Sequence, residues 1–199
     1  LNGIFPPLSK VEKESIGVVS EARRRELEAG RMHARVALAA LNISDINIPK
    51  CLLSGAPIWP KSVTGSITHT KYMGNSHLAV VVARSEQIRS LGIDAEWGLP
   101  LHPDLWDQFL SNEELTWISS EPMAERNFTV RKIWSLKEAA IKAAGGGDMT
   151  DWRVFPHLVD YNNYIVRPRL NDPEEAMAYV GRAICWNNLT IAVVYIQSR

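Results

Sequence analysis

The stretch "LGIDAEW", residues 91–97, alternates apolar residues with Gly92, Asp94 and Glu96. Its residues favour a strand, and a strand places alternate side chains on opposite faces. One face then carries apolar side chains that can enter a core, namely Leu91, Ile93, Ala95 and Trp97. The other face carries two carboxylates, Asp94 and Glu96, beside Gly92. Two interpretations are open at this point: an ordinary solvated face, or a site that holds something positive.

The residues before this strand predict a helix, a long connection and one more strand. Residues 21–41 predict a helix with one apolar stripe. Residues 48–66 contain three prolines and two glycines, which indicates an extended, loop-rich connection. Residues 77–83 and 88–97 then predict two strands.

Helices and then strands follow a break at residues 98–103. Residues 104–119 predict short helices, with Ser111 and Glu114 in a capping-box pattern, and residues 126–144 predict a longer helix. The tail predicts four strands, within residues 152–155, 164–170, 176–186 and 189–196. This order indicates an α+β fold with antiparallel sheets.

Composition excludes several classes of protein. The 199 residues include 22 basic and 22 acidic side chains, so no overall charge draws the chain to nucleic acid or to an anionic membrane. No apolar run approaches the roughly 20 residues that span a bilayer, and residues 1–10 lack the apolar core of a signal peptide. Two cysteines without zinc spacing are too few for a disulfide scaffold. We expect a cytoplasmic protein.

Two charges fall on the buried side of the predicted helix at 126–144. Lys137 and Glu138 lie on or beside the apolar stripe that Ile133, Trp134 and Ile141 help to form. A buried charge is costly unless it is paired or binds a metal. A structural Lys–Glu arrangement, a lysine that reaches solvent, a surface pair of Glu138 with Lys142, and a functional site all remain open.

Three carboxylates are thus candidates for one site. Asp94, Glu96 and Glu138 are hard oxygen ligands without a cysteine partner, which suits Mg²⁺ better than zinc. Because Mg²⁺ completes its shell with water and phosphate oxygens, phosphate-binding groups are expected nearby.

Such groups occur in two segments. Five arginines lie between residues 23 and 35, and on a helix Arg24, Arg31 and Arg35 form one stripe with Arg23 nearby. The alternative is a solvated basic face, balanced by Glu26 and Glu28. The second segment, "GSITHT" at 65–70, offers Ser66, Thr68 and His69.

These residues resemble the motifs of a known family. "GSITH" (65–69), "GIDAE" (92–96) and "WSLKEAAIK" (134–142) are similar, in order and approximate spacing, to the three motifs of 4′-phosphopantetheinyl transferases. The resemblance is to the monomeric type that activates surfactin and enterobactin synthetases. "RRRELEAGRMHARVAL" (23–38) and "GAPIWP" (55–60) resemble segments that precede those motifs in the enterobactin-associated branch.

The resemblance implies an activity and roles for individual residues. The family transfers phosphopantetheine from coenzyme A (CoA) to a serine of an acyl or peptidyl carrier protein and releases 3′,5′-ADP. The implied ligands of Mg²⁺, with Mn²⁺ as the alternative, are Asp94, Glu96 and Glu138. The implied CoA contacts are Arg23 and Arg31 at the 3′-phosphate, Thr68 beside the nucleotide, and His69 and Lys142 at the pyrophosphate.

Two further roles follow from the resemblance. Glu114 matches the base for the carrier serine, with Glu113 as the alternative register and the capping box as a competing role. Lys137 matches the lysine that meets charge on the leaving phosphate. The usual basic residue before Gly55 is absent, and Lys50 or Lys61 could replace it.

The implied fold has two similar halves, residues 1–99 and 100–199, related by a pseudo-twofold axis with the CoA site in the cleft between them. The segment "KAAGGG" (142–147) is closer to the surfactin-activating branch. A metal-dependent hydrolase of CoA or a related pyrophosphate, and a catalytically silent CoA- or carrier-binding module, are the alternative functions.

Overall fold

The computed structural model describes residues 7–98, 101–157, 160, 162–169 and 177–198. Its helices are α1 (Lys10–Ile16), α2 (Glu21–Ala40), the 3₁₀ turn η1 (Pro103–Gln108), α3 (Asn112–Ser120), α4 (Met123–Ala144) and the 3₁₀ turn η2 (Met149–Asp151). Its strands are β1 (Val63–Tyr72), β2 (Asn75–Arg84), β3 (Ile88–Trp97), β4 (Trp152–Pro156), β5 (Asn163–Pro168), β6 (Tyr179–Trp186) and β7 (Leu189–Gln197).

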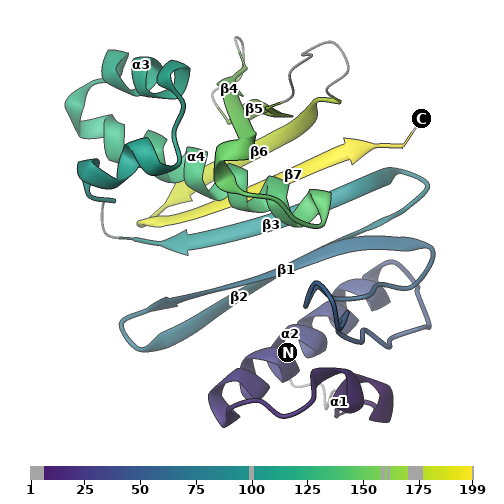
Figure 1. Ribbon diagram of the computed structural model, residues 1–199. Helices are drawn as coiled ribbons and strands as arrows, with labels where there is room; N and C mark the ends of the chain where they lie inside the picture. The colour runs from purple at the N-terminus through teal and green to yellow at the C-terminus, as the bar shows by residue number, and fades with distance from the viewer. Residues whose placement is uncertain (1–6, 99–100, 158–159, 161, 170–176, 199) are drawn as a thin grey trace.

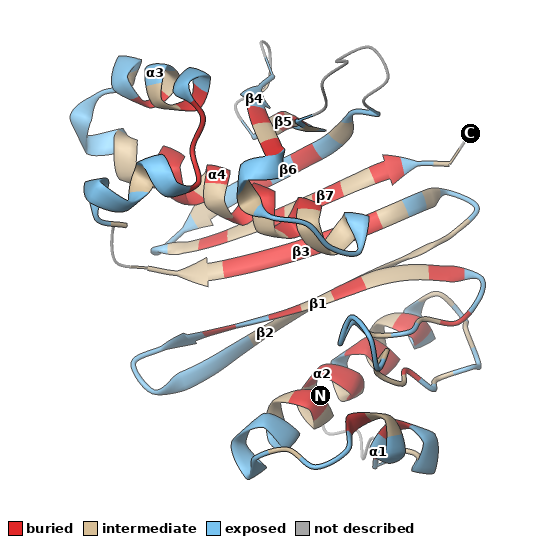
Figure 2. Ribbon diagram, viewed as in Figure 1, coloured by how far each residue is buried: buried red, intermediate tan, exposed pale blue. Residues whose placement is uncertain are grey.

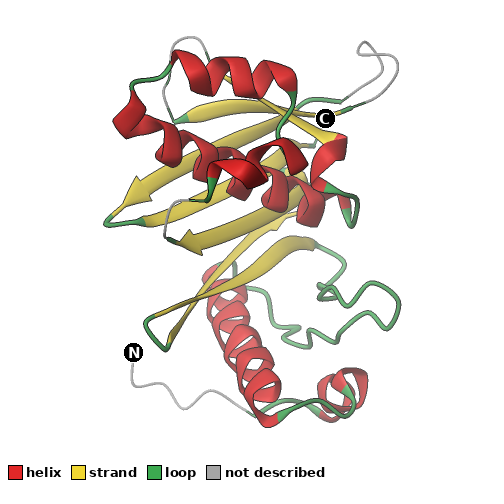
Figure 3. Ribbon diagram, turned by 60° about the vertical axis from the view of Figure 1, so that its left-hand side comes forward, coloured by secondary structure: helices red, strands yellow, loops and turns green. Residues whose placement is uncertain are grey.

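The strands form two antiparallel sheets, which confirms the predicted α+β fold. The hairpin β1–β2 is one sheet, and the other has the order β3-β7-β6-β5-β4. Helix α4 packs across β3, β7 and β6, and α2 packs against the hairpin (Figures 1 and 3). Each half therefore has a helix on antiparallel strands, in line with the two similar halves that the resemblance implies.

The interior is divided in the same way. The larger core lies between α3, α4 and the five-stranded sheet, whereas Ala34, Leu38, Ile48 and Val63 form a smaller one under α2 (Figure 2). Strand β3 hydrogen-bonds to β7, so it belongs to the sheet of the C-terminal half although it precedes residue 100. The division at 99/100 stays a prediction.

A close backbone contact fixes how α4 sits on β3. A Cβ atom at Gly92 would lie 1.9 Å from the carbonyl oxygen of Ala139, so only glycine allows this approach. Because side chains alternate along a strand, Asp94 and Glu96 leave β3 on the same face as Gly92. The face that carries the carboxylates is therefore the one that α4 covers.

Most predicted elements are confirmed, with differences at their ends. The predictions for α2, β2, β3, η1, α3 and β4 to β7 hold, and α4 begins at Met123 rather than near residue 126. Helix α1 and strand β1 were not predicted, and the predicted loop at 48–66 ends at Val63, where β1 begins. Residues 1–6, 99–100, 170 and 176 belong to predicted segments but lie outside the described residues.

Candidate functional site

The carboxylates of β3 do not form a solvated face. Asp94 is only 3% exposed, and Glu96 and Glu138 are half-buried. Burial raises the pKa of both glutamates, and the nearby Asp94 carboxylate raises each pKa further. The three predicted carboxylates therefore lie close enough to repel one another, on β3 and on the helix that covers it.

Asp94 is the carboxylate with the most specific surroundings. Its Oδ1 atom accepts hydrogen bonds from Lys142 Nζ at 2.7 Å and from Thr68 Oγ1 at 3.2 Å. Its Oδ2 atom is buried and has no hydrogen-bond partner among the residues that the structure describes. A buried carboxylate oxygen without a donor is unusual, and a bound cation would satisfy it.

The arrangement is not a complete metal site by itself. The described ranges contain no group of three or more His, Cys, Asp and Glu side chains placed to hold a metal ion. The residues nevertheless fit a divalent cation, because the donors are hard carboxylate oxygens and Asp94 Oδ2 lacks a partner. Metal binding by Asp94, Glu96 and Glu138 thus stays a proposal.

Strand β1 connects these carboxylates to the rest of the site. Thr70 Oγ1 donates to Glu96 Oε2 at 3.3 Å, parallel to the contact of Thr68 with Asp94. Lys142 Nζ, from the last turn of α4, donates to both Thr68 and Asp94. That turn ends at Gly145, whose φ of 81° forms a left-handed helix cap.

A cavity of about 560 Å³ lies between α2, β1 and the end of α4. This volume is within the range of small-molecule sites. Four predicted CoA contacts line the cavity, namely Arg23, Arg31, His69 and Lys142. Thr68, the fifth predicted contact, does not belong to this lining; its buried hydroxyl accepts a hydrogen bond from Lys142, which does. The segment 54–57 and Trp59 also line it, whereas Lys50 and Lys61 do not belong to its lining.

The arginines of α2 have different surroundings, and only those near the start of the helix form a solvated, charge-balanced face. Arg24 is exposed and pairs with Glu21 and Glu28. Arg31 is 4% exposed, and its Nε donates to the carbonyl of Ile48 at 3.0 Å. Burial lowers the Arg31 pKa, and its Nη2 has no partner in the described part of the chain. A buried guanidinium nitrogen beside a cavity suits an anionic ligand.

Arg35 lies one helical turn after Arg31 on the same face of α2, but it does not belong to the cavity lining. It is buried and forms an ion pair with the buried Glu12, whose Oε1 also accepts from the backbone of Ile48 at 2.9 Å. Within the predicted stripe, Arg35 therefore forms a structural ion pair, whereas Arg31 lines the cavity.

Glu114 and Lys137 form a buried pair outside the lining of the cavity. Lys137 Nζ donates to Glu114 Oε2 at 2.7 Å and to the carbonyl of Phe109 at 2.6 Å. Glu114 also accepts from the backbone of Ser111 and of Val154, each at 2.8 Å. The capping box of Ser111 and Glu114 is confirmed, whereas the predicted catalytic roles of Glu114 and Lys137 stay predictions.

Burial also distinguishes the two neighbouring glutamates. Glu113 is exposed, and hydrogen bonds to its own backbone N–H and to Ser111 lower its pKa.

The two lysines near Glu138 on α4 pair with other carboxylates. Lys137 has Glu114 as its partner rather than Glu138, and Lys142 forms its ion pair with Asp94.

The sequence analysis did not single out Lys71, and it gave Glu26 only as part of a solvated face. Glu26 lines the cavity and contacts Arg23, His69 and Lys71. Its neighbours in sequence are three arginines, which favoured a solvated charge pair. If β1 had been predicted as a strand, its alternation would have placed His69 and Lys71 on one face of that strand. Their shared face would then have drawn attention to Glu26.

Comparisons with known proteins indicate the same family as the motifs. The family model for the 4′-phosphopantetheinyl transferase N-terminal domain matches residues 12–83, and that for the 4′-phosphopantetheinyl transferase superfamily matches residues 90–194. The chain is 36% identical over 132 residues to 4′-phosphopantetheinyl transferase Npt of Nocardia iowensis, a match that covers 66% of this chain and 56% of that protein.

A second relative and a solved structure are also similar to parts of this chain. The chain is 34% identical over 146 residues to 4′-phosphopantetheinyl transferase Svp of Streptomyces mobaraensis, covering 69% of this chain and 55% of Svp. It is also similar to the holo-ACP synthase of Plasmodium yoelii, with 16% identity, a TM-score of 0.45, and coverage of 56% and 96%. The chain thus spans about half the length of the curated relatives it matches.

The superfamily match extends over more than half of the residues and includes β3, α4 and the strands behind them. The chain therefore belongs to the 4′-phosphopantetheinyl transferase superfamily.

Proposed function

We propose that this chain transfers the 4′-phosphopantetheine group from CoA to a serine of an acyl or peptidyl carrier protein. The observation that carries the proposal is the junction at Lys142. This ammonium contacts the buried Asp94 and also lines a cavity that Arg23, Arg31 and His69 share. A cluster of carboxylates and a cluster of cations thus meet at one point, as a pyrophosphate bound with a divalent cation requires.

The reaction exchanges one phosphorus–oxygen bond for another. The serine oxygen bonds to the phosphorus that carries pantetheine, the bond from that phosphorus to the bridging oxygen breaks, and 3′,5′-ADP leaves. His69 and Lys142 would bind the pyrophosphate, Arg23 and Arg31 the 3′-phosphate, and Thr68 would lie beside the nucleotide. The lysine and the two arginines offset the charge that would repel the serine oxygen, and all of these side chains hold the phosphates in place.

Mg²⁺, or Mn²⁺ in its place, would be held by Asp94, Glu96 and Glu138. When bound, such an ion neutralises the pyrophosphate and orients it for in-line attack. Glu114 is the assigned acceptor of the serine proton and Lys137 the assigned partner of the leaving phosphate. Both assignments require the buried contact between them to open, because that contact occupies Glu114 Oε2.

The finer assignments belong to the same proposal. We assign the chain to the monomeric surfactin- and enterobactin-synthetase-activating type, acting in the cytoplasm on a carrier protein. The proposed division into halves at residues 99/100 is supported by the cavity lining, which comes mainly from α2 and β1 before this point and from the end of α4 after it. Within the described ranges, no helix has the length and apolar character that crossing a membrane requires.

The test is the mass of an apo carrier protein after incubation with this chain, CoA and Mg²⁺. The proposal expects a gain of one phosphopantetheine and an equal amount of 3′,5′-ADP. Release of 3′,5′-ADP without carrier would instead indicate a hydrolase. CoA binding without either product would indicate a silent binding module.

A further inference from the structure

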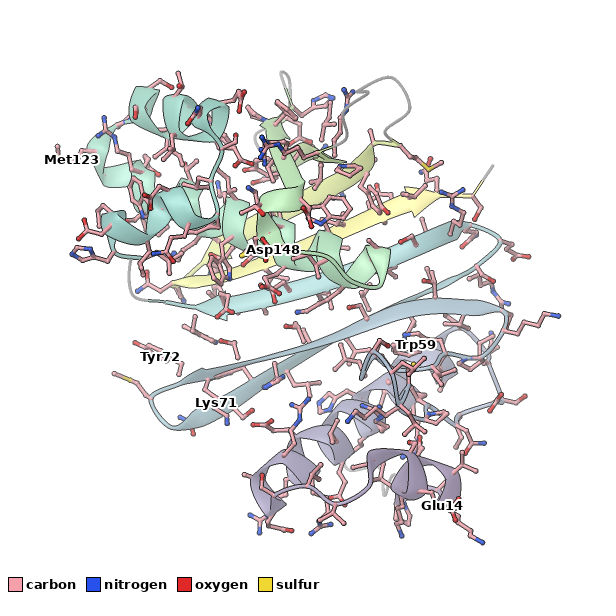
Figure 4. All side chains as sticks on the ribbon, viewed as in Figure 1. Glu14, Trp59, Lys71, Tyr72, Met123 and Asp148 are labelled. Carbon is pink, nitrogen blue, oxygen red and sulfur yellow. The ribbon has the colours of Figure 1, made fainter. Side chains whose placement is uncertain are left out.

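One acidic residue lies among the cations of the cavity. Glu26, on α2, has a side chain that is 14% exposed and belongs to the cavity lining. Its Oε1 lies 2.7 Å from Lys71 Nζ, and its Oε2 lies 3.1 Å from Arg23 Nη1 and 3.5 Å from His69 Nε2. Lys71 is near the tip of the β1–β2 hairpin (Figure 4). One carboxylate thus joins the basic groups of two elements.

The other acidic residues of α2 have a different environment. Glu21 and Glu28 pair with Arg24 and Arg25 at the exposed surface, and neither glutamate belongs to the cavity lining. The hydrogen bond from Lys71, with smaller effects from Arg23 and His69, lowers the Glu26 pKa. Glu26 is therefore ionised at neutral pH and contributes a fixed negative charge to a cavity otherwise suited to anions.

Resting on the proposed function, we propose that Glu26 is a specificity-determining residue that competes with the 3′-phosphate of the nucleotide for Arg23, the side chain assigned to that phosphate. A phosphate that contacts Arg23 replaces the carboxylate as its counter-ion and meets the like charge of Glu26. Glu26 therefore reduces how much the 3′-phosphate adds to affinity. Because CoA and 3′,5′-ADP carry the same phosphate, this reduction also speeds the release of the product.

The test compares CoA with dephospho-CoA, which differs only in lacking that phosphate. Glu26→Gln keeps the size of the side chain and an oxygen that can accept from Lys71, but it removes the charge. We expect the variant to bind CoA about tenfold more tightly, which corresponds to about 1.4 kcal/mol, as measured by titration calorimetry. Its affinity for dephospho-CoA should stay within about twofold of the parent value, and inhibition by 3′,5′-ADP should strengthen by the same factor as CoA binding.

Two further variants separate charge from structure. Glu28→Gln makes the same change of charge on the same helix and also breaks an ion pair, with Arg24 at 2.6 Å, but it lies outside the cavity lining and should leave both affinities unchanged. Glu26→Asp keeps the charge, and it should retain a CoA affinity close to that of the parent.

Three results would overturn the inference. Weaker or equal CoA binding by Glu26→Gln would mean that Glu26 orients the cations rather than competing for them. An equal gain for CoA and dephospho-CoA would indicate a general charge effect. Tighter CoA binding by both Glu26→Asp and Glu26→Gln would indicate a change of shape. If the parent chain binds no CoA, the proposed function itself is wrong. The three results above all require a parent that binds CoA, so they are distinct from that failure.

Discussion

Lys137 Nζ lies 2.7 Å from Glu114 Oε2, and both side chains are buried in the core between α3, α4 and β4. Lys137 is completely inaccessible to solvent, and this burial lowers its pKa, whereas the Glu114 carboxylate opposes that decrease. Lys137 also donates to the backbone carbonyl of Phe109, and Glu114 accepts from the backbone N–H groups of Ser111 and Val154. It therefore connects three segments of the C-terminal half.

The first prediction is that Glu114→Gln destabilises the protein. The substitution leaves the Lys137 charge buried without a counter-ion, which costs about 3–5 kcal/mol of unfolding free energy. Urea unfolding monitored by tryptophan fluorescence measures the change. Glu113→Gln is the matched control, since Glu113 is exposed, and it should change stability by less than about 0.5 kcal/mol. Turnover should also fall, because Glu114 is the proposed base, and a Glu114→Gln protein with the stability of the parent would contradict the structural role of the pair.

The second prediction concerns the stability of Glu138→Gln as a function of pH. Burial and the Asp94 carboxylate raise the Glu138 pKa above its ordinary value of 4.5, so its ionised form costs stability in the fold. The cost is absent below pH 4.5 and appears as the pH rises through the raised pKa. In EDTA the variant should melt like the parent at low pH and no lower at neutral pH. A clear loss of melting temperature at neutral pH would make Glu138 a structural partner of a lysine.

The third prediction is that the same variant responds less to ligands. Ligands stabilise a protein in proportion to their affinity for the folded state, and Glu138→Gln removes one proposed ligand of Mg²⁺. The shift in melting temperature on adding Mg²⁺ and CoA together should be much smaller than for the parent, and transfer should be nearly abolished. A normal shift would remove Glu138 from the metal site.

The fourth prediction assigns Arg31 to the 3′-phosphate. Charge-assisted hydrogen bonds contribute about 1.5–3 kcal/mol, so Arg31→Gln should weaken CoA binding by roughly 10- to 100-fold. Dephospho-CoA should lose little, and calorimetry with the two ligands measures the difference. Arg25→Gln is the control, because Arg25 is exposed and pairs with Glu21. Equal losses for the two ligands would show that Arg31 acts only through its contact with Ile48.

The fifth prediction tests the contact of α4 with β3. Gly92→Ala places a methyl group against the Ala139 carbonyl, so α4 must move away from β3 and carry Glu138 with it. Overpacking of this kind costs typically about 1–3 kcal/mol, and CoA affinity in the presence of Mg²⁺ should also fall. Gly30→Ala is the control: its Cβ would meet its first neighbour at 3.4 Å, and it should leave stability unchanged or higher.

Periodicity predicted the elements that have one strong pattern. Strand β3 was predicted to the residue, and α4 was predicted with Lys137 on its buried side. Strand β1 was missed because three of its four buried positions are Ser66, Thr68 and Thr70, whose hydroxyl groups do not produce an apolar alternation. Those hydroxyls are buried because two of them donate to Asp94 and Glu96, a pairing between strands that a single segment cannot reveal.

The partner of a charged side chain was harder to predict than the face on which it lies. Lys137 was predicted to be buried, yet its partner, Glu114, lies 23 residues earlier on another helix. Glu26 and Glu28 look alike in sequence, but only Glu26 faces β1 and the cavity. Helical periodicity determines the face on which a charge lies, and the tertiary fold determines what lies opposite that face.

The pairing of β3 with β7 has a consequence for how the protein is made. Asp94 lies opposite Ala192, so the strand that carries the two carboxylates pairs with the strand that the ribosome produces after it has made nearly all of the other described residues. Contacts this distant in sequence form late and slow folding. Helix α2 and the hairpin β1–β2 are made well before β7, whereas β3 can take its place in the five-stranded sheet only after β7 has been made. A growing chain can therefore bring Arg23, His69 and Lys71 together around Glu26 well before the carboxylates of β3 are held in that sheet.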